Sequence, residues 1–101
     1  MQMNLGMNVQ AIDLFNAMKQ SSVMTQNGYV LLYEKTFTAQ QNGSDGYGLC
    51  FTDSTRNTYI HIRIYGHGVV SSFEYIATLD VNKTADNDMD DLLQELKQKF
   101  P

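Results

Sequence analysis

The chain has 101 residues, of which 43% are hydrophobic and 11% aromatic, enough apolar material for one small core but not for two. Its formal net charge of −4 sets up a field that repels phosphate, so the composition disfavours broad nucleic-acid binding by counterion release. The single cysteine, Cys50, excludes an internal disulfide, a dithiol redox motif and a cysteine-rich zinc site.

The first ten residues, MQMNLGMNVQ, contain neither a basic segment nor a continuous apolar one and therefore do not resemble a signal peptide. The chain also lacks the run of about 18 apolar residues that a transmembrane helix needs. We therefore expect a single cytoplasmic domain covering residues 1–101. Within it we expect residues 1–7 to be disordered unless a partner or a second copy of the chain covers them.

Residues 8–20 have the periodicity of an amphipathic helix, and Asn8 is a suitable N-cap. The following residues, SSVMTQNG, break this pattern and end in the turn dipeptide Asn27-Gly28. We therefore predict a helix over residues 8–20. Its apolar stripe follows the spacing i, i+3, i+4 and i+7 and consists of Ala11, Leu14, Phe15 and Met18.

The middle of the chain is rich in aromatic and β-branched residues, and segments rich in glycine, asparagine, aspartate and serine interrupt it. The pattern predicts a loop over 40–46, short turns over 54–57 and 66–68, and a loop over 80–85. The expected strands are residues 29–39, 47–53, 59–65 and 69–79.

The C-terminal segment predicts a second amphipathic helix, with Thr84 or Asp86 as its cap, aspartates in the first turn and lysines in the last. Its apolar stripe consists of Met89, Leu92, Leu93, Leu96 and Phe100.

The order α-β-β-β-β-α with short links predicts an antiparallel four-stranded meander, because parallel pairing would need long crossovers. Each helix has a single apolar stripe, so both are expected to pack on one face of the sheet. The predicted fold class is therefore a two-layer α+β domain.

The segment TYIHIRIY alternates isoleucine with polar and aromatic residues, and side chains alternate between the two faces of a strand. If the isoleucines face the helices, the opposite face of the sheet is left open to solvent. That face then presents Tyr59, His61, Arg63 and Tyr65.

The turn lengths predict which residues lie opposite one another. A four-residue turn at 54–57 places Phe51 against Ile60, Leu49 against Ile62 and Cys50 beside His61. A two-residue turn at His67-Gly68 places Ile62 against Phe73 and Ile60 against Tyr75, and the same register places His61 against Glu74.

Cys50, His61 and Glu74 would then form one line across three strands, with the residue types of a thiol nucleophile, its base and an orienting acid. A sheet face is open to water, however, and no oxyanion donors are evident in the sequence. We predict no catalytic residue, and we keep a small thiol-dependent enzyme or ligand binder that uses these three residues as an alternative.

Tyrosine and arginine are the residues that most often anchor protein interfaces, so the polar row predicts a partner-binding face. An ordinary ladder of side chains that shields the sheet is the competing explanation. Aromatic residues on an open sheet also resemble single-stranded RNA platforms, but those need a basic surround. The predicted partner-binding residues are Tyr59, His61, Arg63, Tyr65 and Glu74.

The last helix concentrates negative charge that could form the rim of such an interface, together with the loop 40–46. The charge also suits the helix dipole and solubility. No metal is predicted, because His61 and His67 have no further ligands at suitable spacing, and no cofactor is predicted, because residues 43–48 lack the ending of a phosphate loop. The acidic rim residues are Asp86, Asp88, Asp90 and Asp91.

The sequence therefore predicts a small acidic protein-binding module without enzymatic activity, which inhibits or regulates a partner with a basic or mixed surface by covering it. Immunity proteins, antitoxins and phage-encoded inhibitors of host defence share this general profile, although no motif identifies a family. Membrane association is not expected, and the pattern leaves a homodimer open.

Overall fold

The computed structural model describes residues 1–38, 45–79 and 84–100. Most of the expected loop 40–46 and residues 80–83 of the expected loop 80–85 lie outside this part of the chain. The elements, in chain order, are β1 (Gln2–Gln10), α1 (Ala11–Lys19), α2 (Ser22–Gln26), β2 (Val30–Phe37), β3 (Gly46–Asp53), β4 (Thr58–Tyr65), β5 (Val69–Thr78) and α4 (Thr84–Lys99).

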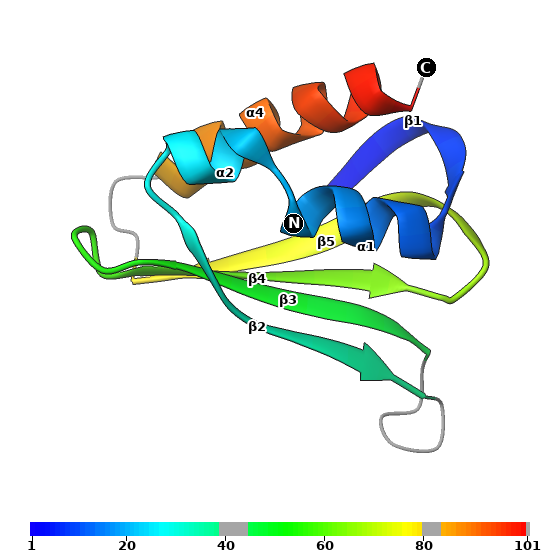
Figure 1. Cartoon of the computed structure of the whole chain (residues 1–101), viewed down its shortest axis with the longest axis horizontal. Coiled ribbons are helices and arrows are strands. Elements are labelled where there is room, and N and C mark those ends of the chain that lie inside the picture. The colour runs from blue at the N-terminus through cyan, green and yellow to red at the C-terminus, as the bar shows by residue number, and fades with distance from the viewer. Residues whose placement is uncertain (39–44, 80–83, 101) are drawn as a thin grey trace.

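The strands form one antiparallel sheet with the order β1-β5-β4-β3-β2, and the helices lie together on one face of it (Figure 1). The predicted meander of strands is present from β2 to β5, and the α+β class is confirmed. The prediction of four strands was wrong, because a fifth strand, β1, pairs with β5 at the edge of the sheet.

Strand β1 occupies most of the segment for which we expected disorder. Its side chains alternate, with Met3 and Leu5 buried between exposed neighbours, and Met3 lies opposite Phe73 of β5. The pairing is irregular between Asn4 and Val9, where Gly6 has a φ of 73°. The period-2 pattern was present in the sequence, but methionine and asparagine are weak strand signals.

Helix α1 begins at Ala11 rather than at Asn8, because the chain is still extended at Gln10. The stripe Ala11, Leu14, Phe15 and Met18 is buried, as predicted. The short helix α2 was missed. It begins at Ser22, directly after the cap residue Ser21, whose side chain accepts a hydrogen bond from the amide of Met24 at 3.1 Å.

Helix α4 begins at Thr84, so Asp86 lies within its first turn rather than at its cap. Met89, Leu92 and Leu96 of the predicted stripe are fully buried, while Leu93 and Phe100 pack against the edge of the core. No helix of the described residues combines the length and the apolar character that crossing a membrane requires.

Glu95 of α4 fastens α2 to the last helix. Its carboxylate accepts hydrogen bonds from the hydroxyl of Ser21 and, at 3.0 Å and 2.7 Å, from the amide and hydroxyl of Ser22. Burial raises the pKa of Glu95, but these hydrogen bonds outweigh burial and hold the pKa below its ordinary value of 4.5. The stability that they contribute is therefore present above pH 4.5 and is lost as the pH falls through the folded pKa.

We expect Glu95→Gln to remove this part of the acid sensitivity. Urea unfolding at pH 6 and at pH 3 should show a smaller loss of stability in the variant than in the wild type, since all other carboxylates are common to both. Equal losses in the two proteins would contradict the assignment.

Candidate functional site

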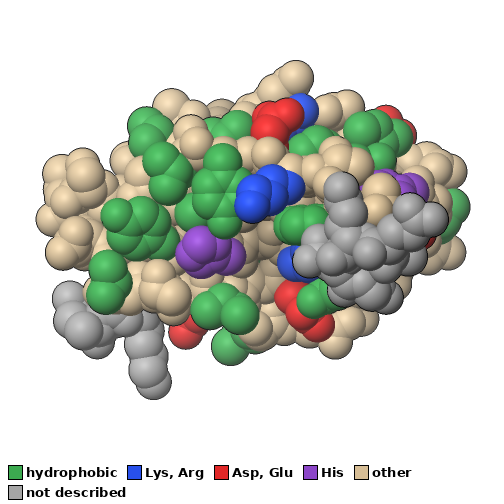
Figure 2. Space-filling model, turned by 90° about the horizontal axis from the view of Figure 1, so that it is seen from below, with side chains coloured by type: hydrophobic (Ala, Val, Ile, Leu, Met, Phe, Trp, Pro, Cys, Tyr) green, Lys and Arg blue, Asp and Glu red, His purple; other side chains and the backbone are tan. Residues whose placement is uncertain are grey.

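The face of the sheet opposite the helices is called here the helix-free face. In β4 the three isoleucines are buried beneath the helices, and the intervening side chains point the other way, as predicted. Figure 2 shows hydrophobic side chains gathered over this face, with basic and histidine side chains among them. Its central residues are Tyr33, Lys35 and Phe37 of β2, Cys50 of β3, Tyr59, His61, Arg63 and Tyr65 of β4, and Glu74 and Ile76 of β5.

The predicted register between β3 and β4 is confirmed, with Phe51 opposite Ile60, Leu49 opposite Ile62 and Cys50 opposite His61. The predicted register between β4 and β5 was wrong by two residues: Ile60 lies opposite Ala77 and Ile62 opposite Tyr75.

The connection between β4 and β5 explains this shift. It passes through Gly66 at a φ of 110°, and Val69 and Val70 then pair with β1 instead of β4. Glu74 therefore lies opposite Arg63, and His61 lies opposite Ile76. Cys50 and His61 are therefore neighbours as predicted, but Glu74 does not lie beside His61.

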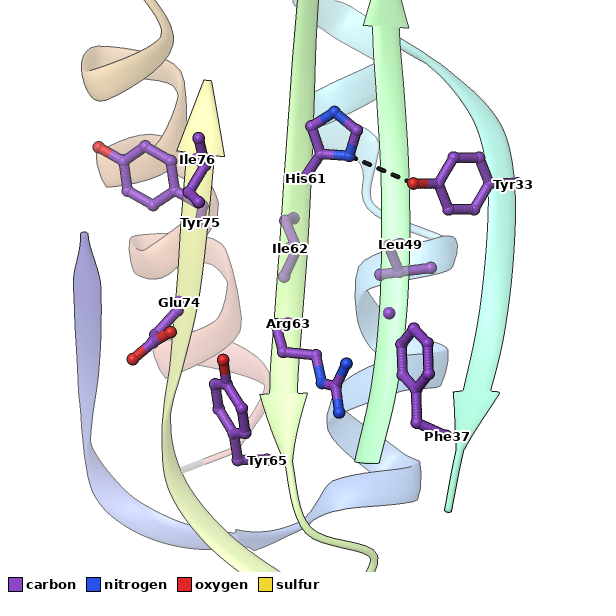
Figure 3. Close-up of a pocket in the computed structure, with 11 residues that line it drawn as sticks. Tyr33, Phe37, Leu49, His61, Ile62, Arg63, Tyr65, Glu74, Tyr75 and Ile76 are labelled. Atoms are coloured by element: carbon purple, nitrogen blue, oxygen red, sulfur yellow. Dashed lines mark hydrogen bonds between the residues drawn. The ribbon is translucent and has the colours of Figure 1, made fainter. Parts of the chain in front are cut away.

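Arg63 lies within a stack of rings at one end of the helix-free face. Its guanidinium carbon is 3.8 Å from the ring centre of Phe37 and 5.1 Å from that of Tyr65 (Figure 3). Phe37 can lie flat against β3 because Gly48 has no side chain, and a Cβ there would be 2.8 Å from the ring. Burial and a hydrogen bond to Glu74 raise the pKa of Tyr65. The cation–π contacts fix the guanidinium plane before any partner arrives.

A second cluster lies further along the face. The hydroxyl of Tyr33 is 3.2 Å from Nδ1 of His61 (Figure 3). Tyr33 also lies opposite Cys50, which is fully buried. Burial raises the pKa of the Cys50 thiol, although a hydrogen bond with Tyr33 lowers it in part. The thiol is thus both shielded and protonated at neutral pH, which is unfavourable for a nucleophile.

We expect Cys50 to react slowly with a maleimide in the native protein, on the order of a hundredfold more slowly than in denaturant. Mass spectrometry of quenched samples would measure both rates. A reaction rate in the native protein close to that of the unfolded chain would contradict the burial of Cys50 and would support the thiol-dependent alternative.

Between the two clusters the helix-free face is hollowed. The hollow has a volume of about 190 Å³, smaller than the roughly 300 Å³ at which pockets for small-molecule ligands begin. It matches one inserted side chain better than a cofactor. Its main walls are Tyr33, Phe37, His61, Arg63, Tyr65 and Ile76.

The residues predicted as an acidic rim do not border this face, because α4 lies in the helix layer on the other side of the sheet (Figure 1). Asp88 is buried, and Asp86 accepts a hydrogen bond from the hydroxyl of Tyr75, so both hold α4 in place. Asp90 and Asp91 are exposed. Placing these residues at the rim was therefore wrong, since the acidic helix covers the opposite side.

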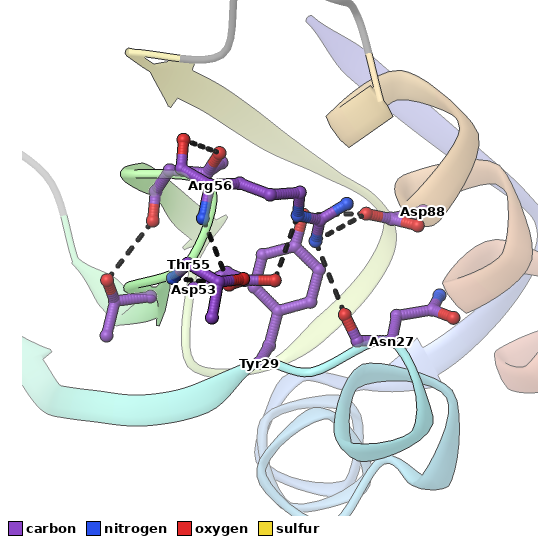
Figure 4. Close-up of polar contacts among 8 residues, drawn as sticks. Asn27, Tyr29, Asp53, Thr55, Arg56 and Asp88 are labelled. Atoms are coloured by element: carbon purple, nitrogen blue, oxygen red, sulfur yellow. Dashed lines mark hydrogen bonds and ion pairs between the residues drawn. The ribbon is translucent and has the colours of Figure 1, made fainter.

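Arg56, in the turn between β3 and β4, was not recognised from the sequence. It donates to Asp53 at 2.9 Å and to Asp88 at 3.3 Å, and it lies over the ring of Tyr29, whose hydroxyl donates to Asp88 at 2.6 Å (Figure 4). The sequence signal was Asp53 two residues before Thr55, a spacing typical of a side-chain turn. The contact with α4 has no local signal, and the network is structural.

The two histidines lie in different surroundings. Nε2 of His67 is 2.8 Å from the carbonyl oxygen of Phe37, and its ring meets that of Tyr47 edge-on, whereas His61 contacts Tyr33. Within residues 1–38, 45–79 and 84–100, no three His, Cys, Asp or Glu residues are placed to hold a metal ion.

Comparison of the chain with protein-family models, curated protein sequences and solved structures finds no significant match.

Proposed function

We propose that this protein is a non-enzymatic binding module that inhibits or regulates a partner protein by covering one of its surfaces with the helix-free face. The observation that carries the proposal is the Arg63 stack beside a hollow of side-chain size. Aromatic and arginine side chains of this kind dominate the binding energy of protein interfaces, usually where they meet a pocket.

Two further observations support the proposal. Tyr65 and Ile76 are exposed at the edges of the hollow, and nothing in the described part of the chain covers them. The rings around Arg63 are already ordered by their mutual contacts, which reduces the conformational entropy that binding would cost.

The charges on this face suggest a mixed partner surface. Among the central residues of this face defined above, Lys35, Arg63 and His61 stand against one carboxylate, Glu74, whereas the acidic residues of α4 are on the other side. The partner would then present an acidic group to Arg63 and a basic group to Glu74, with apolar side chains toward Ile76. An immunity protein, antitoxin or phage-encoded anti-defence inhibitor would work in this way.

The alternative of a thiol-dependent enzyme needs Glu74 beside His61 as the orienting acid, but Glu74 lies opposite Arg63. The RNA-platform alternative retains its aromatic residues, but the central residues of the face include only two fixed cations, Lys35 and Arg63, fewer than such platforms commonly use.

Affinity capture from lysate with and without nuclease treatment, with mass spectrometry of the bound proteins, tests the proposal. Three baits should be compared: the wild type, Arg63→Ala/Tyr65→Ala on the helix-free face, and Asp90→Ala/Asp91→Ala on the helix layer. We expect a stoichiometric partner on the first and third baits only. Capture that disappears after nuclease treatment would favour RNA, and equal capture by all three baits would exclude the helix-free face.

A further inference from the structure

Strand β2 is the end strand of the sheet, and it presents four consecutive large apolar residues to solvent. These residues, Val30–Tyr33, are between 37% and 62% exposed. Within the described residues, β2 pairs only with β3, so its outer edge carries backbone groups without a strand partner. An exposed edge of this kind is a template for another strand, and natural proteins normally avoid it.

The exposed apolar residues point to both faces of the sheet. The pairing with β3 is irregular between Leu31 and Tyr33, which brings Tyr33 to the helix-free face beside Cys50, while Leu31 lies beside Phe51 on the helix side. A partner that docks on the helix-free face alone would leave Leu31 uncovered. A strand added to the edge would cover apolar side chains on both faces at once.

The charges of β2 oppose pairing with a second copy of the same strand. A two-fold axis between antiparallel edge strands keeps both helix layers on the same side, so residues with the same orientation must meet. An axis at Glu34 places the two carboxylates opposite each other, and an axis at Lys35 does the same with the ammonium groups. An axis at Tyr33 would require regular pairing across the irregularity between Leu31 and Tyr33. An axis at Thr36 would pair only residues 35–37, because β2 ends at Phe37.

We propose that the edge of β2 binds an extended segment of a partner protein as an additional antiparallel strand. Charge complementarity specifies the segment: an acidic residue opposite Lys35 on the helix-free side, a basic residue opposite Glu34 on the helix side, and apolar residues opposite Val30–Tyr33. Backbone hydrogen bonds would give affinity, and these side-chain pairs would fix the register. Strand addition at β2 does not depend on binding at the helix-free face, although Tyr33 belongs to both surfaces.

The test uses two synthetic peptides with acetylated and amidated ends. The first has glutamate opposite Lys35, lysine opposite Glu34 and valine or isoleucine opposite Val30–Tyr33. The second is identical except that its glutamate and lysine are exchanged. Each is titrated into isotope-labelled protein while the backbone amide signals are followed by NMR.

We expect the first peptide to bind roughly tenfold more tightly than the second, with the largest amide shifts in β2, because each pair changes from attraction to repulsion. In the variant Glu34→Lys/Lys35→Glu the preference should reverse. Glu34 contacts Lys19 at 3.4 Å in an exposed ion pair, so the variant should remain folded, and its thermal unfolding checks this.

No binding by either peptide, equal binding of both, or a preference that persists in the variant would overturn the proposal. A dimer of the protein alone, detected by sedimentation, whose β2 amide signals shift with protein concentration would assign the edge to a second copy instead. Peptide binding should be unchanged by Arg63→Ala/Tyr65→Ala, which separates this result from a test of the helix-free face.

Discussion

Replacing Arg56 by alanine should lower the free energy of unfolding by about 2 to 3 kcal/mol. The guanidinium group joins the turn after β3 to helix α4, and its loss would leave two carboxylates without their cation and the carbonyl oxygen of Asn27 without its donor. The side chains of Asp53 and Asp88 are only 7% and 10% exposed, so water cannot fully replace the lost contacts. For a chain of this size the change corresponds to a fall in melting temperature of roughly 10 to 20 °C.

The matched control is Lys19→Ala, which removes an ion pair whose carboxylate, Glu34, is 50% exposed, against 7% and 10% for Asp53 and Asp88. Its effect should stay within about 1 kcal/mol. Urea unfolding of both variants at neutral pH would measure the difference. A loss in Arg56→Ala as small as that in Lys19→Ala would mean that the network in Figure 4 contributes little to stability.

The second large effect concerns binding. Arg63→Ala/Tyr65→Ala should weaken the binding of this protein to its partner by at least about 2 kcal/mol, or roughly 30-fold in the dissociation constant. The two substitutions remove the guanidinium and one of the two rings that flank it, which destroys a wall of the hollow. Calorimetry or surface plasmon resonance would measure the change.

Two controls make this result specific. The melting temperature of the double variant should stay close to that of the wild type, since Tyr65 is half exposed and Arg63 lies outside the main core. Asp90→Ala/Asp91→Ala should bind as the wild type does at high salt, where only close contacts count. Unchanged affinity in Arg63→Ala/Tyr65→Ala would exclude the Arg63 stack as the binding centre.

The sequence by itself determined those features that depend on neighbouring residues. The 3.6-residue periodicity located α1 and α4 because each has one continuous apolar stripe, and the alternation of TYIHIRIY identified both faces of β4. The pairing of Cys50 with His61 followed from a short, well-defined turn. In these cases local geometry leaves the chain few alternatives.

Only the tertiary structure decided where separate segments meet. The N-terminal strand exists because Met3 and Leu5 find a buried face beside Phe73, and pairing of β1 with the start of β5 shifts the register against β4. Because of that shift, Glu74 lies opposite Arg63 rather than His61, and the predicted line of Cys50, His61 and Glu74 does not form. The assembly of Phe37, Arg63 and Tyr65 and the burial of Asp88 beneath Arg56 likewise join residues from distant elements. Such contacts follow from packing the whole core, because no spacing in the chain encodes them.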